Sequence, residues 1–255
     1  MTVLKDYASK YPDIRFERRD AILLMTFGTD GGSLKWSPRA HRDLGYAFAD
    51  VAADNETKVI IMTGSGPDFL HESQGFGKPY NRPADWDNIY WEGKRLLMNL
   101  LEIEVPIIAA VNGPATLHAE IAVLSDVVLA SETAVFQDQA HFSGGTVPGD
   151  GVHVVWPMLL GMNRGRYFLL TNQALSPREA QTLGIVAEVL PKDKLMPRAW
   201  ELAEQFVKKP ALSLRYTRVT LVQPIKEQMQ RYLGYGLALE GMGVVDARAQ
   251  RPGGS

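Results

Sequence analysis

The middle of the chain reads Val105-Pro-Ile-Ile-Ala-Ala-Val-Asn-Gly-Pro114, an apolar run that ends in a turn signal. A short apolar run bounded by turn residues is typical of a buried strand. Strands of a parallel sheet are apolar throughout because helices cover both faces of the sheet. The run therefore predicts a buried strand over residues 106–111, closed by Asn112-Gly-Pro114.

Further elements are predicted on both sides of this strand. Strands are expected at residues 21–27, 58–63 and 126–130, and helices at 37–51 and 85–101. Strands that alternate with helices through short connections indicate right-handed βαβ units, and hence an α/β fold class. After about residue 150 the pattern is mainly helical. The helices expected there cover residues 176–184, 198–208, 211–222 and 224–247.

The composition limits the function classes. The chain has 255 residues, a net charge of −2 and no cysteine. The charge gives no electrostatic reason to expect nucleic acid or an anionic membrane surface as a partner. The lack of cysteine excludes disulfides, thiolate nucleophiles and Cys-ligated zinc. No secretory signal or membrane span is apparent, so we expect a cytoplasmic protein.

Histidine is concentrated in one part of the chain. Three of the five histidines, His118, His141 and His153, fall in a short window that also contains Asp150. Imidazole is the side chain that changes protonation state near neutral pH, so the window is a candidate for acid–base chemistry. The spacings match no metal motif, and no glycine-rich nucleotide motif is present, so we expect neither a metal nor a cofactor.

Four motifs together resemble the crotonase, or enoyl-CoA hydratase/isomerase, superfamily. Besides residues 105–114 they are Ser125-Asp-Val-Val-Leu-Ala130, Thr146-Val-Pro-Gly-Asp-Gly151 and the run from Leu175 to Leu190. Their order and spacing match the family over roughly residues 14–210. The resemblance implies a core of ββα spirals, a C-terminal helical region, and a homotrimer or a dimer of trimers.

The sequence departs from ordinary members at three places. Their glycine-rich run, whose backbone N–H helps to bind a thioester oxygen, is here Ala115-Thr-Leu-His-Ala-Glu120. Their Gly-Ala-Asp motif is replaced by Phe69-Leu-His-Glu-Ser-Gln74, and their catalytic glutamate by His141. With Trp36, Phe136-Gln-Asp138 and residues 149–157, these departures resemble the β-diketone hydrolases, a branch typified by 6-oxocamphor hydrolase.

The branch implies a reaction and a set of residues. Its members cleave the C–C bond between two ketones by a retro-Claisen reaction, without CoA or metal, to give a keto acid. Its functional residues map onto Trp36, His118, His141, Asp150 and Glu240. Glu240 rests on the weakest match.

Each of these residues has an expected role in the chemistry. His141 with Asp150 would be the base that activates water, and His118 would hold a carbonyl or enolate oxygen. The indole N–H of Trp36 would hold the other carbonyl, and Glu240 would take part in proton transfer with a raised pKa.

Plainer interpretations remain open at this point. Asp150 could instead cap the helix that begins near Gly151. His118 could instead be a histidine at a helix end whose ring bonds to backbone groups. Trp36 is also placed for packing, and Glu240 for an exposed helix position. His41, His71 and His153 receive structural or surface interpretations.

Two other functions stay open as well. Glu120, two residues after His118, keeps an enoyl-CoA hydratase or isomerase as the alternative function. A catalytically silent family member that serves as a binding module is the third.

We expect three regions along the chain. A crotonase-like spiral core would span residues 1–205, a C-terminal helical trimerisation region 206–250, and a disordered tail 251–255. The small-molecule partner would be a cyclic or bicyclic β-diketone.

Overall fold

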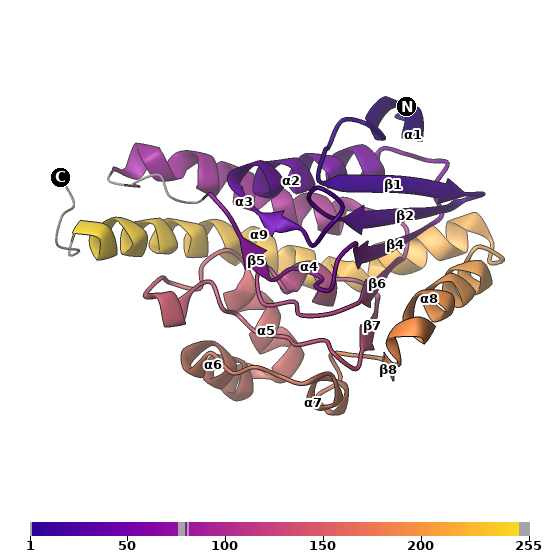
Figure 1. Cartoon of the computed structure of the whole chain (residues 1–255). Coiled ribbons are helices and arrows are strands. Elements are labelled where there is room, and N and C mark those ends of the chain that lie inside the picture. The colour runs from indigo at the N-terminus through magenta and orange to yellow at the C-terminus, as the bar shows by residue number, and fades with distance from the viewer. Residues whose placement is uncertain (1, 76–79, 81, 250–255) are drawn as a thin grey trace.

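The computed structural model describes residues 2–75, 80 and 82–249 (Figure 1). The strands are β1 (Ile14–Arg19), β2 (Ile22–Phe27), β3 (Lys35–Trp36), β4 (Val59–Gly64), β5 (Glu72–Ser73), β6 (Ile107–Val111), β7 (Val127–Ser131) and β8 (Glu188–Leu190). The helices are α1 (Leu4–Tyr7), α2 (Pro38–Ala52), α3 (Pro83–Glu102), α4 (Glu120–Val123), α5 (Val152–Leu160), α6 (Met162–Thr171), α7 (Pro177–Thr182), α8 (Lys192–Phe206) and α9 (Ala211–Ala249), with a 3₁₀ turn at Phe142–Gly144.

Six strands form one sheet in the order β1-β2-β4-β6-β7-β8. Only β1 runs antiparallel to its neighbour, and the pairs from β2 to β8 are parallel. The predicted strand at 106–111 is β6, and it lies between β4 and β7 as a central strand. The other three predicted strands correspond to β2, β4 and β7. The prediction of an α/β fold class is confirmed.

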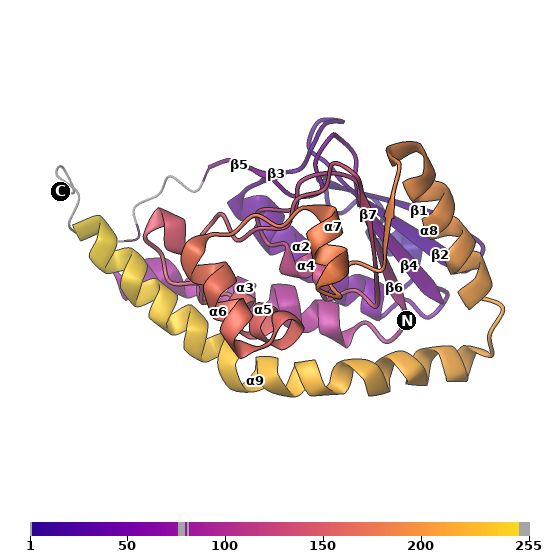
Figure 2. The ribbon, with the colours of Figure 1, turned by 90° about the horizontal axis from the view of Figure 1, so that it is seen from below.

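Both faces of the sheet are buried, as the apolar strands predict. On one face Ile108 and Ala110 of β6 belong to a cluster with Leu195 and Ala199 of α8. On the other face the alternate residues of the same strands join the larger core, to which α2 and α3 contribute. Figure 2 shows α8 on one side of the sheet and α2 and α3 on the other. Alternation of side chains along a strand explains how one apolar run serves two cores.

The helix starts follow the predicted capping signals. The Ser37 side chain accepts a hydrogen bond from the Ala40 N–H at the start of α2, and Pro38 is the first helical residue. Ser176 and Glu179 form a capping box at α7, and Gly184 beyond its end has a φ of 78°. A positive φ there requires a residue without a Cβ to avoid strain.

The C-terminal helices differ from the prediction in one respect. The two separate helices expected at 211–222 and 224–247 are one helix, α9, with Pro224 inside it. An interior proline costs a helix about 3 kcal/mol. Val222, Met229 and Leu233 are buried on both sides of the proline, and this burial offsets that cost. Helix α8 likewise begins at Lys192, before the predicted residue 198, with Pro197 inside it.

Helix α9 runs along the whole molecule and packs against α3 and α5 (Figure 2). The division into a core over 1–205 and a helical region over 206–250 stays a prediction, and the tail predicted at 251–255 lies outside the described residues. Among the helices of the described ranges, none combines the length and apolar character that crossing a bilayer requires.

Candidate active site

The five residues that the sequence singles out line one cavity of about 530 Å³. Trp36 comes from β3, His118 from the turn before α4, and Glu240 from the last third of α9. His141 and Asp150 come from the segment between β7 and α5. The fold thus brings four distant parts of the chain to one place. Their catalytic roles stay predictions.

Three carboxylates surround the imidazole of His141. Its Nδ1 lies 2.6 Å from Asp138 Oδ1, while its Nε2 lies 3.3 Å from Asp150 Oδ2 and 3.6 Å from Glu240 Oε1. Burial disfavours the charged ring, but the carboxylates of Asp150, Asp138 and Glu240 outweigh this effect. They raise the pKa of His141 well above its usual 6.5. These surroundings therefore favour the protonated form of the ring.

Asp150 lies between the two histidines of the site. Its Oδ2 is 3.3 Å from His141 Nε2 and 3.4 Å from His118 Nδ1. Burial would raise the pKa of this carboxyl, but the two imidazoles overcome burial and lower it. The N-cap of α5 is Gly151, whose φ is 113°, so the capping role considered for Asp150 is wrong.

His118 is held by a carboxylate and by an indole ring. Its Nδ1 lies 2.5 Å from Glu120 Oε1, and its ring packs on Trp36 with centroids 4.3 Å apart. Its partner is a carboxylate, so the interpretation of a histidine satisfied by backbone is wrong. Burial opposes the charged ring, yet Glu120 and Asp150 raise the pKa of His118. The residue has a φ of 47°, a left-handed conformation that is strained for a side chain with a Cβ.

Two glutamates of the site are deeply buried. Glu240 is 6% exposed, so the interpretation of an exposed helix position is wrong. Burial raises the pKa of Glu240 to about 7, so this side chain exchanges a proton near neutral pH. Glu120 is fully buried, and burial raises its pKa although the neighbouring His118 favours its charged form.

Two glycines bring the loop of Asp150 against α9. A Cβ at Gly149 would lie 2.2 Å from the carbonyl oxygen of Gly236 and 2.7 Å from Glu240 Cβ. A Cβ at Gly236 would lie 2.2 Å from His153 Cε1. The backbones of the two segments therefore touch only because both positions lack a side chain, and this contact sets the spacing of Asp150 and Glu240.

The remaining histidines lie in different surroundings. His41 of α2 lines the cavity, with Nδ1 3.3 Å from Glu92 Oε2 and its ring edge-on to Trp36. His71 also lines the cavity, and its Nδ1 lies 2.7 Å from Thr116 Oγ1. His153 contacts the carbonyl of Tyr232, which agrees with its structural interpretation.

Sequence reasoning missed Asp138 as a site residue. It lies three residues before His141, within a motif that contributed to the resemblance, so the signal was the spacing of the two. Glu120 lies two residues after His118, so their proximity was also predictable from the sequence. The pairing of His41 with Glu92, 51 residues apart, had no local signal.

Four carboxylate oxygens of the site are buried and have no hydrogen-bond partner within the described part of the chain. They are Glu120 Oε2, Asp138 Oδ2, Asp150 Oδ1 and Glu240 Oε2. Among the lining residues that the structure describes, none is lysine or arginine. Of these four residues, Asp150 and Glu240 line the cavity, so their carboxylates offer acceptors to a bound water or substrate.

The spacing of these groups also bears on metal binding. His118, Glu120 and Asp150 form one group, and His141, Asp150 and Glu240 another, with ligand atoms within 4.8 Å of one another. This is close enough to share a metal ion. Protons on the histidines balance the same carboxylates, and we assign no metal to either group.

A family model described as enoyl-CoA hydratase/isomerase matches residues 18–240. The chain belongs to this family. Among curated proteins, it is 30% identical to a probable peroxisomal enoyl-CoA hydratase of Arabidopsis thaliana over 205 residues, which are 78% of this chain and 72% of that protein. It is also 30% identical to a carnitinyl-CoA dehydratase of Salmonella enteritidis over 200 residues, 76% of each protein.

Solved structures of the family share the fold. A β-diketone hydrolase from the cyanobacterium Anabaena sp., bound to (S)-3-oxocyclohexyl acetic acid, has 48% identity and a TM-score of 0.93, covering 95% of this chain and 98% of that one. An enoyl-CoA hydratase/isomerase from Mycobacterium paratuberculosis has 24% identity and a TM-score of 0.83, covering 92% and 94%. The second likeness shows the crotonase fold alone.

Proposed function

We propose that this crotonase-family member hydrolyses a C–C bond of a cyclic or bicyclic β-diketone to give a keto acid, without CoA or metal. The observation that carries the proposal is the pair of carboxylate-bound histidines, His118 and His141, that face Asp150 in one cavity. The 48% identity to a β-diketone hydrolase that holds a cyclic keto acid supports it.

The first step is the addition of water to one ketone. Neutral His141 takes a proton from water through Nε2 while the water oxygen forms a bond to the carbonyl carbon. The carbonyl oxygen becomes an oxyanion, and the Asp150 carboxylate, 3.3 Å from Nε2, stabilises the imidazolium that forms. A positioned base of this kind contributes about 10²–10⁴-fold to the rate.

The second step breaks the C–C bond. The oxyanion collapses to a carboxylic acid, and the electron pair of the broken bond moves to the other ketone as an enolate. His118 and the indole N–H of Trp36 hold the enolate oxygen, a role worth about 3–4 kcal/mol in an oxyanion hole. The proton taken from water returns to the enolate carbon, from His141 directly or through Glu240, so that protons balance.

The family names keep an acyl-CoA hydratase or isomerase as the second candidate. Local backbone bonds weigh against it. The N–H groups of Thr116 and Leu117 both donate to the carbonyl of Leu70, at 2.8 and 3.1 Å. These amides lie in the segment that replaces the family's glycine-rich run, so they are already used and do not face a thioester oxygen. Glu120, the glutamate such a reaction would use, is engaged by His118.

A two-substrate assay tests the proposal. Purified protein is offered a bicyclic, non-enolisable β-diketone, with keto acid formation followed, and separately crotonyl-CoA, with hydration followed. We expect diketone cleavage without CoA turnover, and no heat of CoA binding by calorimetry. Hydration of crotonyl-CoA without diketone cleavage would overturn the proposal and indicate that Glu120 is the catalytic residue of a hydratase.

We also propose that the protein is a homotrimer or a dimer of trimers. Large apolar side chains stay exposed along two helices of the isolated chain, among them Met162 and Leu170 of α6 and Tyr235 and Met242 of α9. Contiguous exposed apolar surface is typical of subunit contacts. Light scattering should give three or six times the chain mass of 28.2 kDa, and a monomer would contradict the proposal.

A further inference from the structure

We infer that Asp138 is the positioning residue of His141. Its carboxylate accepts the Nδ1 hydrogen of the imidazole, which leaves Nε2 to face the cavity as the nitrogen that exchanges the proton. The inference rests on the proposed function and adds one assignment to it, because the sequence pairs His141 with Asp150 alone.

The contacts of the two ring nitrogens separate these roles. Nδ1 lies 2.6 Å from Asp138 Oδ1, whereas Nε2 lies 3.3 Å from Asp150 Oδ2. An ionised carboxylate only accepts hydrogen bonds, so the shorter contact requires the hydrogen on Nδ1. In a neutral imidazole the other nitrogen then carries the lone pair. Asp138 therefore selects the tautomer in which Nε2 is the base.

Backbone bonds fix Asp138 and His141 relative to each other. On either side of Asp138, Phe136 N–H donates to the carbonyl of Leu175 and Gln139 N–H donates to that of Thr116, both at 3.0 Å. The carbonyl of His141 accepts from the N–H groups of Gly144 and Thr146, at 2.8 and 3.0 Å. Asp138 is 5% exposed. The pair is therefore held in one geometry before substrate arrives.

Asp150 then has a different task. It faces the nitrogen that must give and take the proton, and it lies almost as close to His118 Nδ1. A carboxylate in that place stabilises the charge that appears when Nε2 is protonated. One carboxylate, Asp138, thus orients the His141 ring, and another, Asp150, stabilises its charge. A metal-bound imidazole is oriented in the same way, by a carboxylate that accepts its other ring N–H.

The tautomer can be measured without substrate. In ¹⁵N-histidine-labelled protein, nuclear magnetic resonance reports which ring nitrogen of His141 loses its hydrogen as the pH rises. The carboxyl groups that act on this ring are Asp138, Asp150 and Glu240, and the imidazoles of His118 and His153 are also close enough to interact with it. We expect the hydrogen to stay on Nδ1 in the wild type. In Asp138→Asn the amide can donate to Nδ1, so we expect a mixture of tautomers and deprotonation at lower pH.

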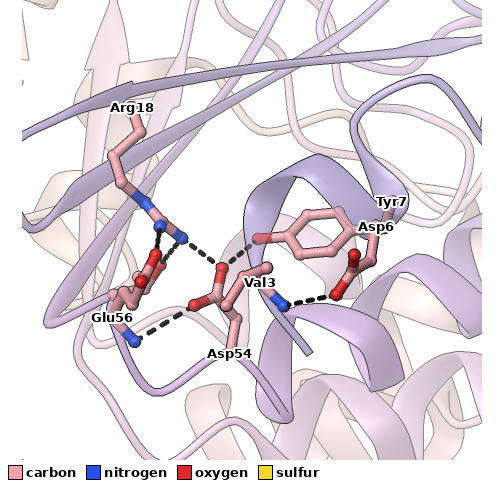
Figure 3. Close-up of polar contacts among 7 residues, drawn as sticks. Val3, Asp6, Tyr7, Arg18, Asp54 and Glu56 are labelled. Atoms are coloured by element: carbon pink, nitrogen blue, oxygen red, sulfur yellow. Dashed lines mark hydrogen bonds and ion pairs between the residues drawn. The ribbon is translucent and has the colours of Figure 1, made fainter. Parts of the chain in front are cut away.

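Kinetics give the second readout. Asp138→Asn should lower kcat by about 10²–10⁴-fold with KM changed by less than about threefold, because the wrong tautomer cannot accept the proton. The matched control is Asp54→Asn, another buried aspartate, which bonds Tyr7 and Arg18 away from the cavity (Figure 3). This control should change the thermal midpoint and leave both kcat and the His141 spectrum unchanged.

The outcomes separate this inference from the proposed function. An Asp138→Asn protein that keeps the wild-type tautomer and titration overturns the role of Asp138, whatever the kinetics show. A wild type that cleaves no diketone overturns the proposed function, while the spectrum still decides the role of Asp138. Should Asp138→Asn not fold, Asp138→Glu takes its place. It should keep the hydrogen on Nδ1 but lower kcat at least tenfold, and unchanged turnover would overturn the inference.

Discussion

Two buried clusters of charge in this molecule are built differently. In the first, both carboxylate oxygens of Asp54 are used: Oδ2 accepts from Tyr7 and Arg18, and Oδ1 accepts from the N–H of Glu56 (Figure 3). In the second, around His118 and His141, four carboxylates each leave one buried oxygen without a partner in the described part of the chain. The first includes a permanent cation, and the second has only imidazoles.

We interpret the first cluster as one that stabilises the fold, and we propose that the second serves chemistry. Buried polar atoms are normally paired, because an unpaired one costs about 1–3 kcal/mol. In the Asp54 cluster both carboxylate oxygens obey this rule, although Arg18 Nε is buried without a partner in the described part of the chain. The cluster ties α1 and β1 to the segment that follows α2. The cavity cluster breaks the rule in four places, and such exceptions are expected at functional sites. We therefore expect substitutions in the cluster around His141 to lower activity, and substitutions in the Asp54 cluster to lower stability.

The largest effect should come from the proton-transfer groups. We expect His141→Ala and Asp150→Asn each to lower kcat by at least tenfold, and His141→Ala by about 10²–10⁴-fold, because the base is lost. Steady-state turnover of a bicyclic β-diketone measures the effect, with circular dichroism as the check on folding. Near wild-type turnover in both variants would contradict a catalytic role of the second cluster.

The pH dependence of turnover should follow the charge state of His141. Its carboxylate neighbours raise its pKa, and only the neutral ring accepts a proton, so the rate should rise with pH. Below the pKa of His141 the increase is about tenfold per pH unit. Glu240→Gln removes one of these carboxylates and should move the rising limb to lower pH. A rate that falls from pH 6 to 8 would contradict the assignment of His141 as the base.

Glu240 should make the protein less stable as the pH rises. Its pKa is about 7 in the folded protein and near 4.5 when unfolded, so the unfolded state releases this proton first. Stability should therefore decrease between these two values, by about 3 kcal/mol in total. Glu240→Gln cannot lose a proton and should remove this decrease. Thermal midpoints from pH 4.5 to 7.5 test the prediction, and parallel curves for the two proteins would contradict it.

The smallest effect on activity should come from the Asp54 cluster. Asp54→Asn should lower the free energy of unfolding by about 1–3 kcal/mol, because the bonds to Tyr7 and Arg18 lose a charged acceptor. Urea unfolding measures the loss, and kcat should stay within about twofold of the wild type. A variant that keeps its stability but loses turnover would mean that the two clusters are not separate.

The sequence predicts the central sheet well, because apolar runs such as residues 106–111 are long enough to be strands and too apolar to be exposed. It also predicts Trp36, His118, His141, Asp150 and Glu240 as site residues, through a family resemblance. The structure places these five around one cavity. Capping signals at Ser37 and Ser176 are local, so their helix starts were predictable as well.

Other features depend on contacts that a single sequence does not encode locally. Which nitrogen of His141 meets Asp138 is a matter of ring orientation, although their spacing of three residues is visible. The left-handed backbone of His118 has no glycine to indicate it. Pro224 reads as the start of a helix, and only the packing of α9 against the core shows that the helix continues through it.

The close contact between Gly149 and Gly236 depends on the absence of a methyl group at both positions. An alanine at either position forces the loop and the helix apart, since its Cβ would lie 2.2 Å from atoms across the contact. We expect this to move Asp150 and Glu240, which both line the cavity, away from each other. Glycine and alanine codons differ at one base, so we expect a single-nucleotide change to be enough to alter the shape of this cavity.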